Sequence, residues 1–291
     1  MNNFLESVSW IPYALKTNGL FKKIKNPINL DMSIIGLNKK FKFYILENDE
    51  GLSRQLTSFG FREPINLKYS SEFIDNKDVV LDAGANIGLF SLLSFNAKSI
   101  ISVEPIEECI PILKKNLKEN NLLNKSEVLN MAIGKKGKLI LEKNNKVNLS
   151  KVVEKRGANT VEVISRPLDY FVKKFHVNAI RMDVEGYEYD ILYKNIPRGI
   201  NKIAIEFHTA LLGDEKVKEL LVYFENEGFC VKYLIEDLPI RLYPFYKILY
   251  RTGLISLFTY IKTNISPNQS YSLLKKGRKV KYLFLSRGES F

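Results

Sequence analysis

Cysteine is scarce in this sequence, and long apolar runs are absent from it. Cys109 and Cys230 are the only cysteines among 291 residues, too few for a disulfide framework or a thiolate metal cluster. No window of about 18 uninterrupted apolar residues occurs, which argues against a membrane-spanning helix. The N-terminal stretch MNNFLESVSWIPYALKTNG also lacks the basic start and apolar core of a signal peptide. We therefore expect a cytoplasmic protein in a reducing setting.

The composition is that of a folded protein with an uneven positive charge. Hydrophobic residues make up 45% and charged residues 26% of the chain, and the net charge is +12. Between Glu236 and Phe291 ten Lys/Arg face three acids, so this segment alone carries +7. The excess fits either a Lys/Asn/Ile-rich proteome or an anionic partner.

From Val79 onward, short β-branched runs alternate with helix-like stretches. This alternation predicts an α/β fold, a mainly parallel sheet with helices on both faces. A helix is also expected to open at Pro64, a strand near 41–47, and an extra strand or hairpin within 138–167. The expected strands are VVLDAG, SIISVEP, SEVLNMAIG, NAIRMDVEG, NKIAIEFH, FCVKYLI and VKYLFLSR, and the expected helices lie near 87–96, 107–120, 187–195 and 214–227.

The last two expected strands are separated by residues 236–279. A gap of this length is too long for a structureless loop, so it should contain helices of its own. Leu254, Leu257, Phe258 and Ile261 have helical spacing, which is typical of a helix packed against its domain. The aromatic and basic residues of 243–281 also allow contact with an anionic membrane or lipid-linked acceptor, or with RNA, while KKGRKVK could be a solvated edge.

The turn after the first regular strand, DAGANIG, holds the most specific signal. Asn86 and Leu89 stand where a dinucleotide fingerprint has glycine, and the P-loop Lys-Ser/Thr pair is absent. Gly84 permits a close approach of backbone to ligand, and Asp82 before the turn suits a cationic ligand. Glu104 ends the next strand, where a carboxylate can accept both ribose hydroxyls. Together these residues match S-adenosylmethionine, although Asp82 and Asn86 could instead cap a helix.

Candidates for chemistry stand at the ends of the fourth and fifth regular strands. Asp183 is expected to contact the cofactor or the acceptor, while His208 and Glu185 compete as general base. Glu206 is a further catalytic candidate that could instead pair with a buried Lys or Arg, and His208 could be a surface residue. Glu188 fits favourable charge at a helix N-terminus better than catalysis.

Asp183, Glu185, Glu206 and His208 could also hold Mg²⁺, but no Asp-Asn pair stands at the strand ends, so no metal site is expected. The predicted cofactor-binding residues are Asp82, Gly84, Ala85, Asn86, Gly88, Glu104, Pro105, Asn130, Ala132 and Asp183.

Six stretches resemble, in order and spacing, the FkbM-type S-adenosylmethionine-dependent methyltransferases. They are VVLDAGANIGLFSLL, ISVEPIEECIPILKKNLKEN, VLNMAIGKKGKL, ISRPLDYF, IRMDVEGYEYDIL and KIAIEFH, between Glu63 and His208. The resemblance implies the Rossmann-like class I methyltransferase fold, with seven strands of which the last is antiparallel. It also implies O-methylation of a hydroxyl on a glycan, glycolipid or related small molecule.

On this basis residues 1–62 are an N-terminal extension and 63–291 the methyltransferase domain, with an insertion at 236–279. Substrate choice is expected to reside in the extension and the insertion. A tRNA methyltransferase is the alternative enzyme, because the fold is shared and the C-terminal third is basic. A non-catalytic adenosine-ligand-binding protein is the alternative outside the enzymes.

Overall fold

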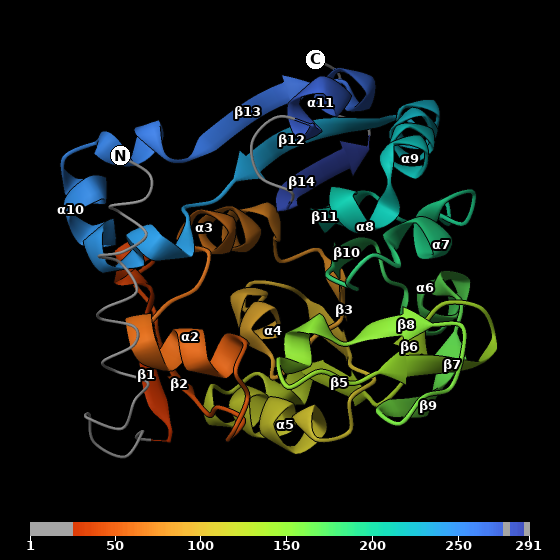
Figure 1. Cartoon of the computed structure of the whole chain (residues 1–291), viewed down its shortest axis with the longest axis horizontal. Coiled ribbons are helices and arrows are strands. Elements are labelled where there is room, and N and C mark those ends of the chain that lie inside the picture. The colour runs from red at the N-terminus through yellow and green to blue at the C-terminus, as the bar shows by residue number, and fades with distance from the viewer. Residues whose placement is uncertain (1–25, 276–279, 288–291) are drawn as a thin grey trace.

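The computed structural model describes residues 26–275 and 280–287, and an eight-stranded mixed sheet forms its centre (Figure 1). The strand order is β13-β12-β14-β11-β10-β3-β4-β5. The strands are β3 (Val79–Ala83), β4 (Ser99–Val103), β5 (Ser126–Leu129), β10 (Ala179–Met182), β11 (Lys202–His208), β12 (Phe229–Glu236), β13 (Tyr260–Ile265) and β14 (Val280–Arg287).

Seven of these strands have the arrangement that the sequence predicts. β3, β4, β5, β10 and β11 run parallel, and β14 is antiparallel to both β11 and β12. The class I methyltransferase fold is therefore confirmed. The expected strand number is too low by one, because β13, from the insertion, pairs antiparallel with the edge strand β12.

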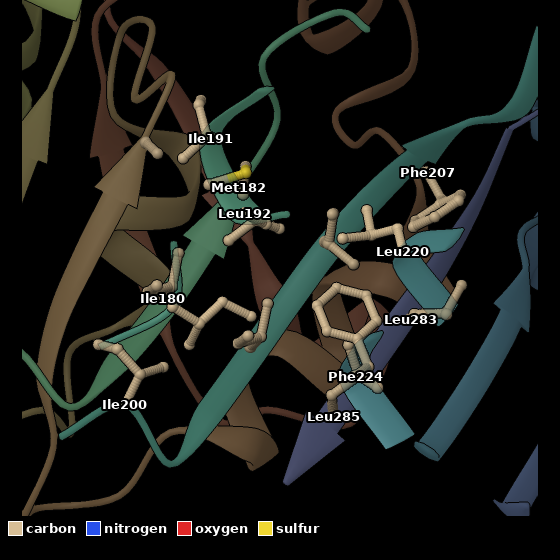
Figure 2. Packing of buried hydrophobic residues seen from close by; sticks show 14 of the residues in the cluster. Ile180, Met182, Ile191, Leu192, Ile200, Phe207, Leu220, Phe224, Leu283 and Leu285 are labelled. Atoms are coloured by element: carbon tan, nitrogen blue, oxygen red, sulfur yellow. The ribbon is translucent and has the colours of Figure 1, made fainter. Parts of the chain in front are cut away.

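Helices cover both faces of the sheet, because side chains alternate along each buried strand. Leu81, Ile180 and Ile203 belong to the largest core cluster, with side chains of the helices that cover this face (Figure 2). Val80 and Ala179 belong to a cluster with α3 (Pro64–Phe73) on the other face. The helices of the first face include α6 (Leu168–Phe175), α7 (Glu188–Leu192), α8 (Thr209–Leu212) and α9 (Asp214–Asn226).

The part of the N-terminal extension that the structure describes packs against the domain. β1 (Ile28–Asp31) and β2 (Lys40–Phe43) pair antiparallel, joined by η1 (Met32–Ile35). With α2 (Leu52–Phe59) they share a core cluster with α4 (Leu89–Leu93) and α5 (Cys109–Glu119). β2 confirms the start of the expected strand near 41–47. Residues 1–25 lie outside the described residues.

A second, four-stranded sheet forms between β5 and α6, where an extra strand or hairpin is expected. The order of its strands is β6-β9-β7-β8. The short helix η2 (Leu123–Lys125) directly precedes β5. The strands and the helical turn among them are β6 (Ala132–Ile133), β7 (Gly137–Glu142), η3 (Val147–Leu149), β8 (Lys151–Val153) and β9 (Thr160–Arg166).

The insertion contains helices, as expected, but only a short 3-10 helix forms where the apolar spacing predicts a longer, packed one. Leu254 and Leu257 bound a short 3-10 helix, and Ile261 lies in β13. These three side chains and Phe258 are at least 37% exposed, so the prediction of a packed helical stripe is wrong. The helices are η4 (Ile240–Phe245), α10 (Tyr246–Arg251), η5 (Leu254–Leu257) and α11 (Pro267–Leu274).

The basic run KKGRKVK falls mostly on residues 276–279, outside the described residues. Within the described ranges, every helix is too short or too polar to cross a bilayer.

Candidate active site

The turn after β3 is held in a conformation that needs glycine. Gly84 has φ +80°, and a Cβ built there would lie 2.0 Å from the main-chain oxygen of Asp183. Gly88 also has positive φ, and its Cβ would lie 2.5 Å from Leu113 Cδ1 on α5. Gly84 therefore lets the turn lie against the end of β10, whereas Gly88 lets α4 and α5 pack closely.

Glu104, just after β4, ties this turn to the neighbouring strand. Its two oxygens accept the main-chain N–H groups of Asn86 and Ile106, each at 2.7 Å. Burial raises the pKa of the Glu104 carboxyl to about 7. The side-chain amide of Asn130 donates to the carbonyls of Glu104 and Pro105, at 3.0 and 3.1 Å. Asn130 therefore supports Glu104 from behind.

The turn and the ends of β4 and β10 border an open cleft of about 890 Å³. Apolar side chains such as Phe90, Met131 and Ile133 form much of the wall. The predicted residues that line the cleft are Gly84, Ala85, Asn86, Glu104, Pro105, Ala132, Asp183 and Glu185. Asp82, Gly88, Asn130, Glu206 and His208 are not part of the lining.

Asp82 lies beneath the cleft and contacts protein groups. It is fully buried, and its Oδ2 accepts the hydroxyl hydrogen of Ser91 at 2.6 Å. Arg181 Nη1 lies 3.6 Å from Oδ1, and Arg181 Nη2 lies 3.3 Å from Asp183 Oδ2. Burial raises the pKa of Asp82 despite this guanidinium. The role of Asp82 as a cofactor ligand stays a prediction, and its observed contacts support the turn.

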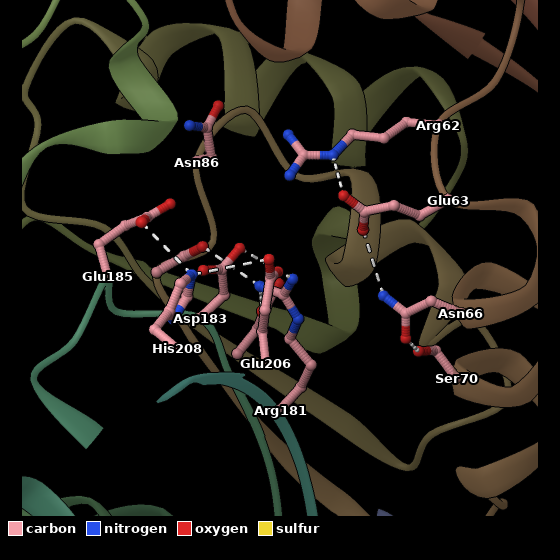
Figure 3. Close-up of polar contacts among 12 residues, drawn as sticks. Arg62, Glu63, Asn66, Ser70, Asn86, Arg181, Asp183, Glu185, Glu206 and His208 are labelled. Atoms are coloured by element: carbon pink, nitrogen blue, oxygen red, sulfur yellow. Dashed lines mark hydrogen bonds and ion pairs between the residues drawn. The ribbon is translucent and has the colours of Figure 1, made fainter. Parts of the chain in front are cut away.

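The predicted catalytic residues meet at the ends of β10 and β11 (Figure 3). His208 Nδ1 lies 2.6 Å from Glu188 Oε1, and its Nε2 lies 3.3 Å from Glu185 Oε2 and 3.7 Å from Glu206 Oε1. His208 is only 5% exposed, so the alternative of a surface histidine is wrong. Glu188 is fully buried and is the first residue of α7, so it stands at a helix N-terminus as expected. It also contacts His208, which the sequence does not predict.

Burial and like charges shift the pKa values of these groups. Burial and the charge of Asp183 raise the pKa of Glu185 to about 7 and that of Glu206 well above its usual range. Burial opposes a charged imidazole, but the hydrogen bond to Glu188 and the surrounding carboxylates raise the pKa of His208 to about 10. Arg181 and other positive groups outweigh burial and lower the pKa of Asp183. Crowded carboxylates of this kind are typical of functional sites.

Sequence reasoning missed two residues that line the cleft, Arg181 and Arg62. Arg181 is 7% exposed, lies 3.6 Å above the Phe90 ring centre and joins Asp82 to Asp183. An arginine in an otherwise apolar strand is the signal that could have found it. Arg62 lines the cleft and pairs with Glu63, from a segment without a motif (Figure 3). The Glu63 main-chain N–H donates to the Tyr243 hydroxyl at 2.8 Å, so the chain just after the N-terminal extension contacts the insertion here.

The residues present fit a nucleoside-containing cation such as S-adenosylmethionine. Gly84 leaves no room for a side chain and so brings main chain to the cleft edge. Glu104 presents a carboxyl at the end of β4, the place of the ribose acid in nucleoside-binding α/β folds. Asp183 and Glu185 add two more carboxyl groups to the lining.

Solved structures resemble the chain at low similarity. A protein of the NADB-Rossmann superfamily from Streptococcus agalactiae has TM-score 0.42 and 11% identity, over 78% of this chain and 69% of that chain. TrmK of M. capricolum, solved with S-adenosylhomocysteine, has TM-score 0.41 and 12% identity, over 77% and 68%. The tRNA m1G37 methyltransferase of M. jannaschii has TM-score 0.41 and 15% identity, over 87% and 53%.

No curated protein matches the sequence. The family model of the methyltransferase FkbM domain matches residues 82–231, which is half of the chain and includes both the glycine turn and the β10 and β11 strand ends. The chain therefore belongs to the FkbM family of S-adenosylmethionine-dependent methyltransferases.

Proposed function

We propose that this methyltransferase acts on a hydroxyl group of a glycan, a glycolipid or a related small molecule. The observation that carries the proposal is Glu185, whose carboxyl lines the cleft beside Asp183. A hydroxyl must lose its proton as the bond to the methyl group forms, so a carboxylate beside the acceptor is the group the reaction needs.

S-adenosylmethionine, when bound, supplies a methyl group that its sulfonium already activates. The residues suited to hold it are those along the cleft edge: the carboxyl of Glu104 for the ribose hydroxyls, the main chain of Gly84 and Ala85 for the amino-acid end, and Ala132 for the base. Asp183 follows β10 and reaches the cleft, where it can orient either substrate.

Between the two candidate bases, the geometry favours Glu185. Its carboxyl faces the cleft, whereas His208 is buried behind it and carries a raised pKa that keeps the ring protonated near neutrality. Glu185 takes the acceptor proton, and His208, 3.3 Å away, holds the Glu185 carboxyl in position. Glu206 also lies outside the cleft lining, so we assign it to the support of Asp183 and His208.

A lipid-linked acceptor is supported by the surface of the insertion. No Asp or Glu occurs between Leu238 and Gly288. Large apolar side chains along the insertion are exposed, including Ile248 at 62% and Leu257 at 72%. An acid-free segment with exposed apolar side chains suits an anionic membrane surface better than water. We propose that residues 243–281 contact anionic lipid.

Transfer of labelled methyl from S-adenosylmethionine into lipid, glycan and RNA fractions of a cell extract tests the acceptor class. Label in the glycan or lipid fraction is expected. Label in RNA alone would replace the proposal with the tRNA methyltransferase alternative. Failure to bind S-adenosylhomocysteine would contradict both.

The Glu185→Gln variant tests the base. We expect transfer to fall about 100-fold or more, with S-adenosylhomocysteine affinity unchanged. Glu107 is an exposed glutamate that follows the cleft residue Ile106 in the sequence. Glu107→Gln is therefore the control, and its rate of methyl transfer should be normal. Full activity of Glu185→Gln would remove Glu185 from the mechanism.

A further inference from the structure

Three metal-ligating side chains converge where β10 and β11 end, beneath the cleft. Asp183, Glu206 and His208 each place one donor atom within 4.8 Å of the other two (Figure 3). Glu206 is 6% and His208 5% exposed, so bulk water does not solvate these atoms freely. Two oxygens and one imidazole nitrogen form a common protein ligand set for a divalent ion.

The ring of His208 is oriented as in metal-binding histidines. Its Nδ1 lies 2.6 Å from Glu188 Oε1, and Glu188 is fully buried. The ring is protonated near neutrality, so a metal ion would replace the proton on Nε2; Nδ1 then stays the N–H donor to Glu188, and the Nε2 lone pair faces Glu206 and Glu185. A lone pair that faces two carboxylates is repelled unless a proton or a metal ion lies between them. A buried carboxylate behind a histidine is the usual support of a metal ligand.

Two oxygens of the same cluster have no hydrogen-bond donor among the described residues. Asp183 Oδ1 and Glu206 Oε2 are both buried without a partner. Arg181 is already placed against the other Asp183 oxygen, at 3.3 Å. Burying an unpaired carboxylate oxygen is costly, so either a proton shared between the two carboxyls or a metal ion is needed at this point.

We propose that Asp183, Glu206 and His208 bind one divalent metal ion beside the methyl acceptor. The nitrogen ligand favours Mn²⁺, Fe²⁺ or Zn²⁺ over Ca²⁺. Ligands about 2.1 Å from an ion lie about 3 Å apart, so the three side chains close slightly around it.

The catalytic part of this inference rests on the proposed O-methylation. The C–S bond of the donor breaks, a C–O bond forms, and the acceptor proton passes to Glu185. A divalent ion at Asp183 would draw electron density from the acceptor oxygen and ease the loss of that proton.

Binding of Mn²⁺ to the chelator-treated full chain tests the site directly. The electron paramagnetic resonance signal of free Mn²⁺ measures how much of the ion is bound. One Mn²⁺ per chain is expected to bind, and Zn²⁺ should displace it. Failure of both ions to bind at millimolar concentration would overturn the proposal.

Variants locate the ion. Asp183→Asn, Glu206→Gln and His208→Asn should each weaken Mn²⁺ binding at least tenfold, and Glu188→Gln about tenfold through the ring orientation of His208. Asp190→Asn, on the same helix as Glu188 but solvent-exposed, is the matched control and should bind normally. Unchanged binding in the three ligand variants, with folding checked by circular dichroism, would place the ion elsewhere and overturn the proposal.

The metal site and the proposed function fail in different ways. Absence of Mn²⁺ binding with methyl transfer intact would remove the ion and leave the function standing. Mn²⁺ binding lost in the three variants, with no transfer to any hydroxyl acceptor, would keep the site and remove the function.

Discussion

Gly84 stands where the turn after β3 meets the end of β10, and a single methyl group there is expected to disturb the site. In Gly84→Ala the new Cβ would lie 2.0 Å from the Asp183 main-chain oxygen. We expect the free energy of unfolding to fall by about 3 kcal/mol and S-adenosylhomocysteine affinity to drop at least tenfold. Urea denaturation and calorimetry measure the two effects.

Gly36→Ala is the control for backbone strain. Gly36 has a similar φ, +83°, but nothing lies within 4 Å of its added Cβ. It should lose only the strain part, about 1 kcal/mol, and keep full affinity. Equal losses in the two variants would show that close packing against Asp183 does not matter.

Glu104 gives cofactor binding a pH dependence. Burial raises the pKa of the Glu104 carboxyl from 4.5 to about 7, so the folded chain keeps a proton that the unfolded chain has already released. The contribution of this protonated carboxyl to the free energy of unfolding is lost as pH rises through 7. Ribose hydroxyls need the ionised carboxylate as acceptor, so binding releases this proton below pH 7. S-adenosylhomocysteine affinity should therefore rise about tenfold from pH 6 to pH 8.

Calorimetry at pH 6 in buffers of different ionisation enthalpy measures the proton released on binding. Glu104→Gln should bind more weakly and lose most of this proton release. Release that persists undiminished in the variant would assign the titration to another group.

At the scale of residues, the sequence predicts only those residues of the candidate site that stand at the ends of strands. Asp183, Glu206 and His208 could be found because parallel strands bring their carboxyl ends to one edge. The contact of Arg181 with Asp82 and the place of Arg62 in the cleft lining could not be assigned, because only the fold brings these distant segments together.

At the scale of elements, Asn116 of α5 fastens the N-terminal hairpin to the domain. Its side chain accepts the Tyr44 main-chain N–H at 2.6 Å and donates to the carbonyls of Tyr44 and Ile87 at 2.9 and 2.7 Å. Asn116 is fully buried, so Asn116→Ala leaves these groups without partners. We expect the free energy of unfolding to fall by about 2–3 kcal/mol in urea denaturation.

Asn120, one turn later, is the matched control. It makes the equivalent pair of bonds to Lys42 on the same hairpin, but these bonds are solvent-exposed. Asn120→Ala should cost less than about 1 kcal/mol, because water replaces the lost partner. A similar loss in both variants would contradict the role of burial.

Elements of the central sheet could be predicted because β-branched runs bury both faces, as at Val79–Ala83 and Ala179–Met182. The helices and the strand of the insertion could not be predicted in this way. α10 ends at Arg251, and the apolar spacing after Gly253 is shared between the 3-10 helix η5 and β13, an edge strand whose partner is distant in sequence. Spacing alone does not say whether an apolar side chain faces core or solvent.

At the scale of the whole molecule, the distribution of charge separates the two proposed binding surfaces. The candidate site gathers buried carboxylates, whereas the insertion combines exposed cations such as Lys247 and Arg251 with exposed apolar side chains. A cationic cofactor and an anionic surface would thus be recognised by different parts of one chain.

The full chain is therefore expected to co-sediment with phosphatidylglycerol vesicles and not with phosphatidylcholine vesicles, more weakly as salt rises. The double variant Ile248→Ser/Leu257→Ser should bind at least tenfold less tightly, because it removes two of the most exposed apolar side chains of the insertion. Ile164→Ser, 52% exposed on β9, removes apolar surface elsewhere and should bind as the unmodified chain does. Equal binding to both vesicle types, or equal losses in the two variants, would contradict a lipid contact through the insertion.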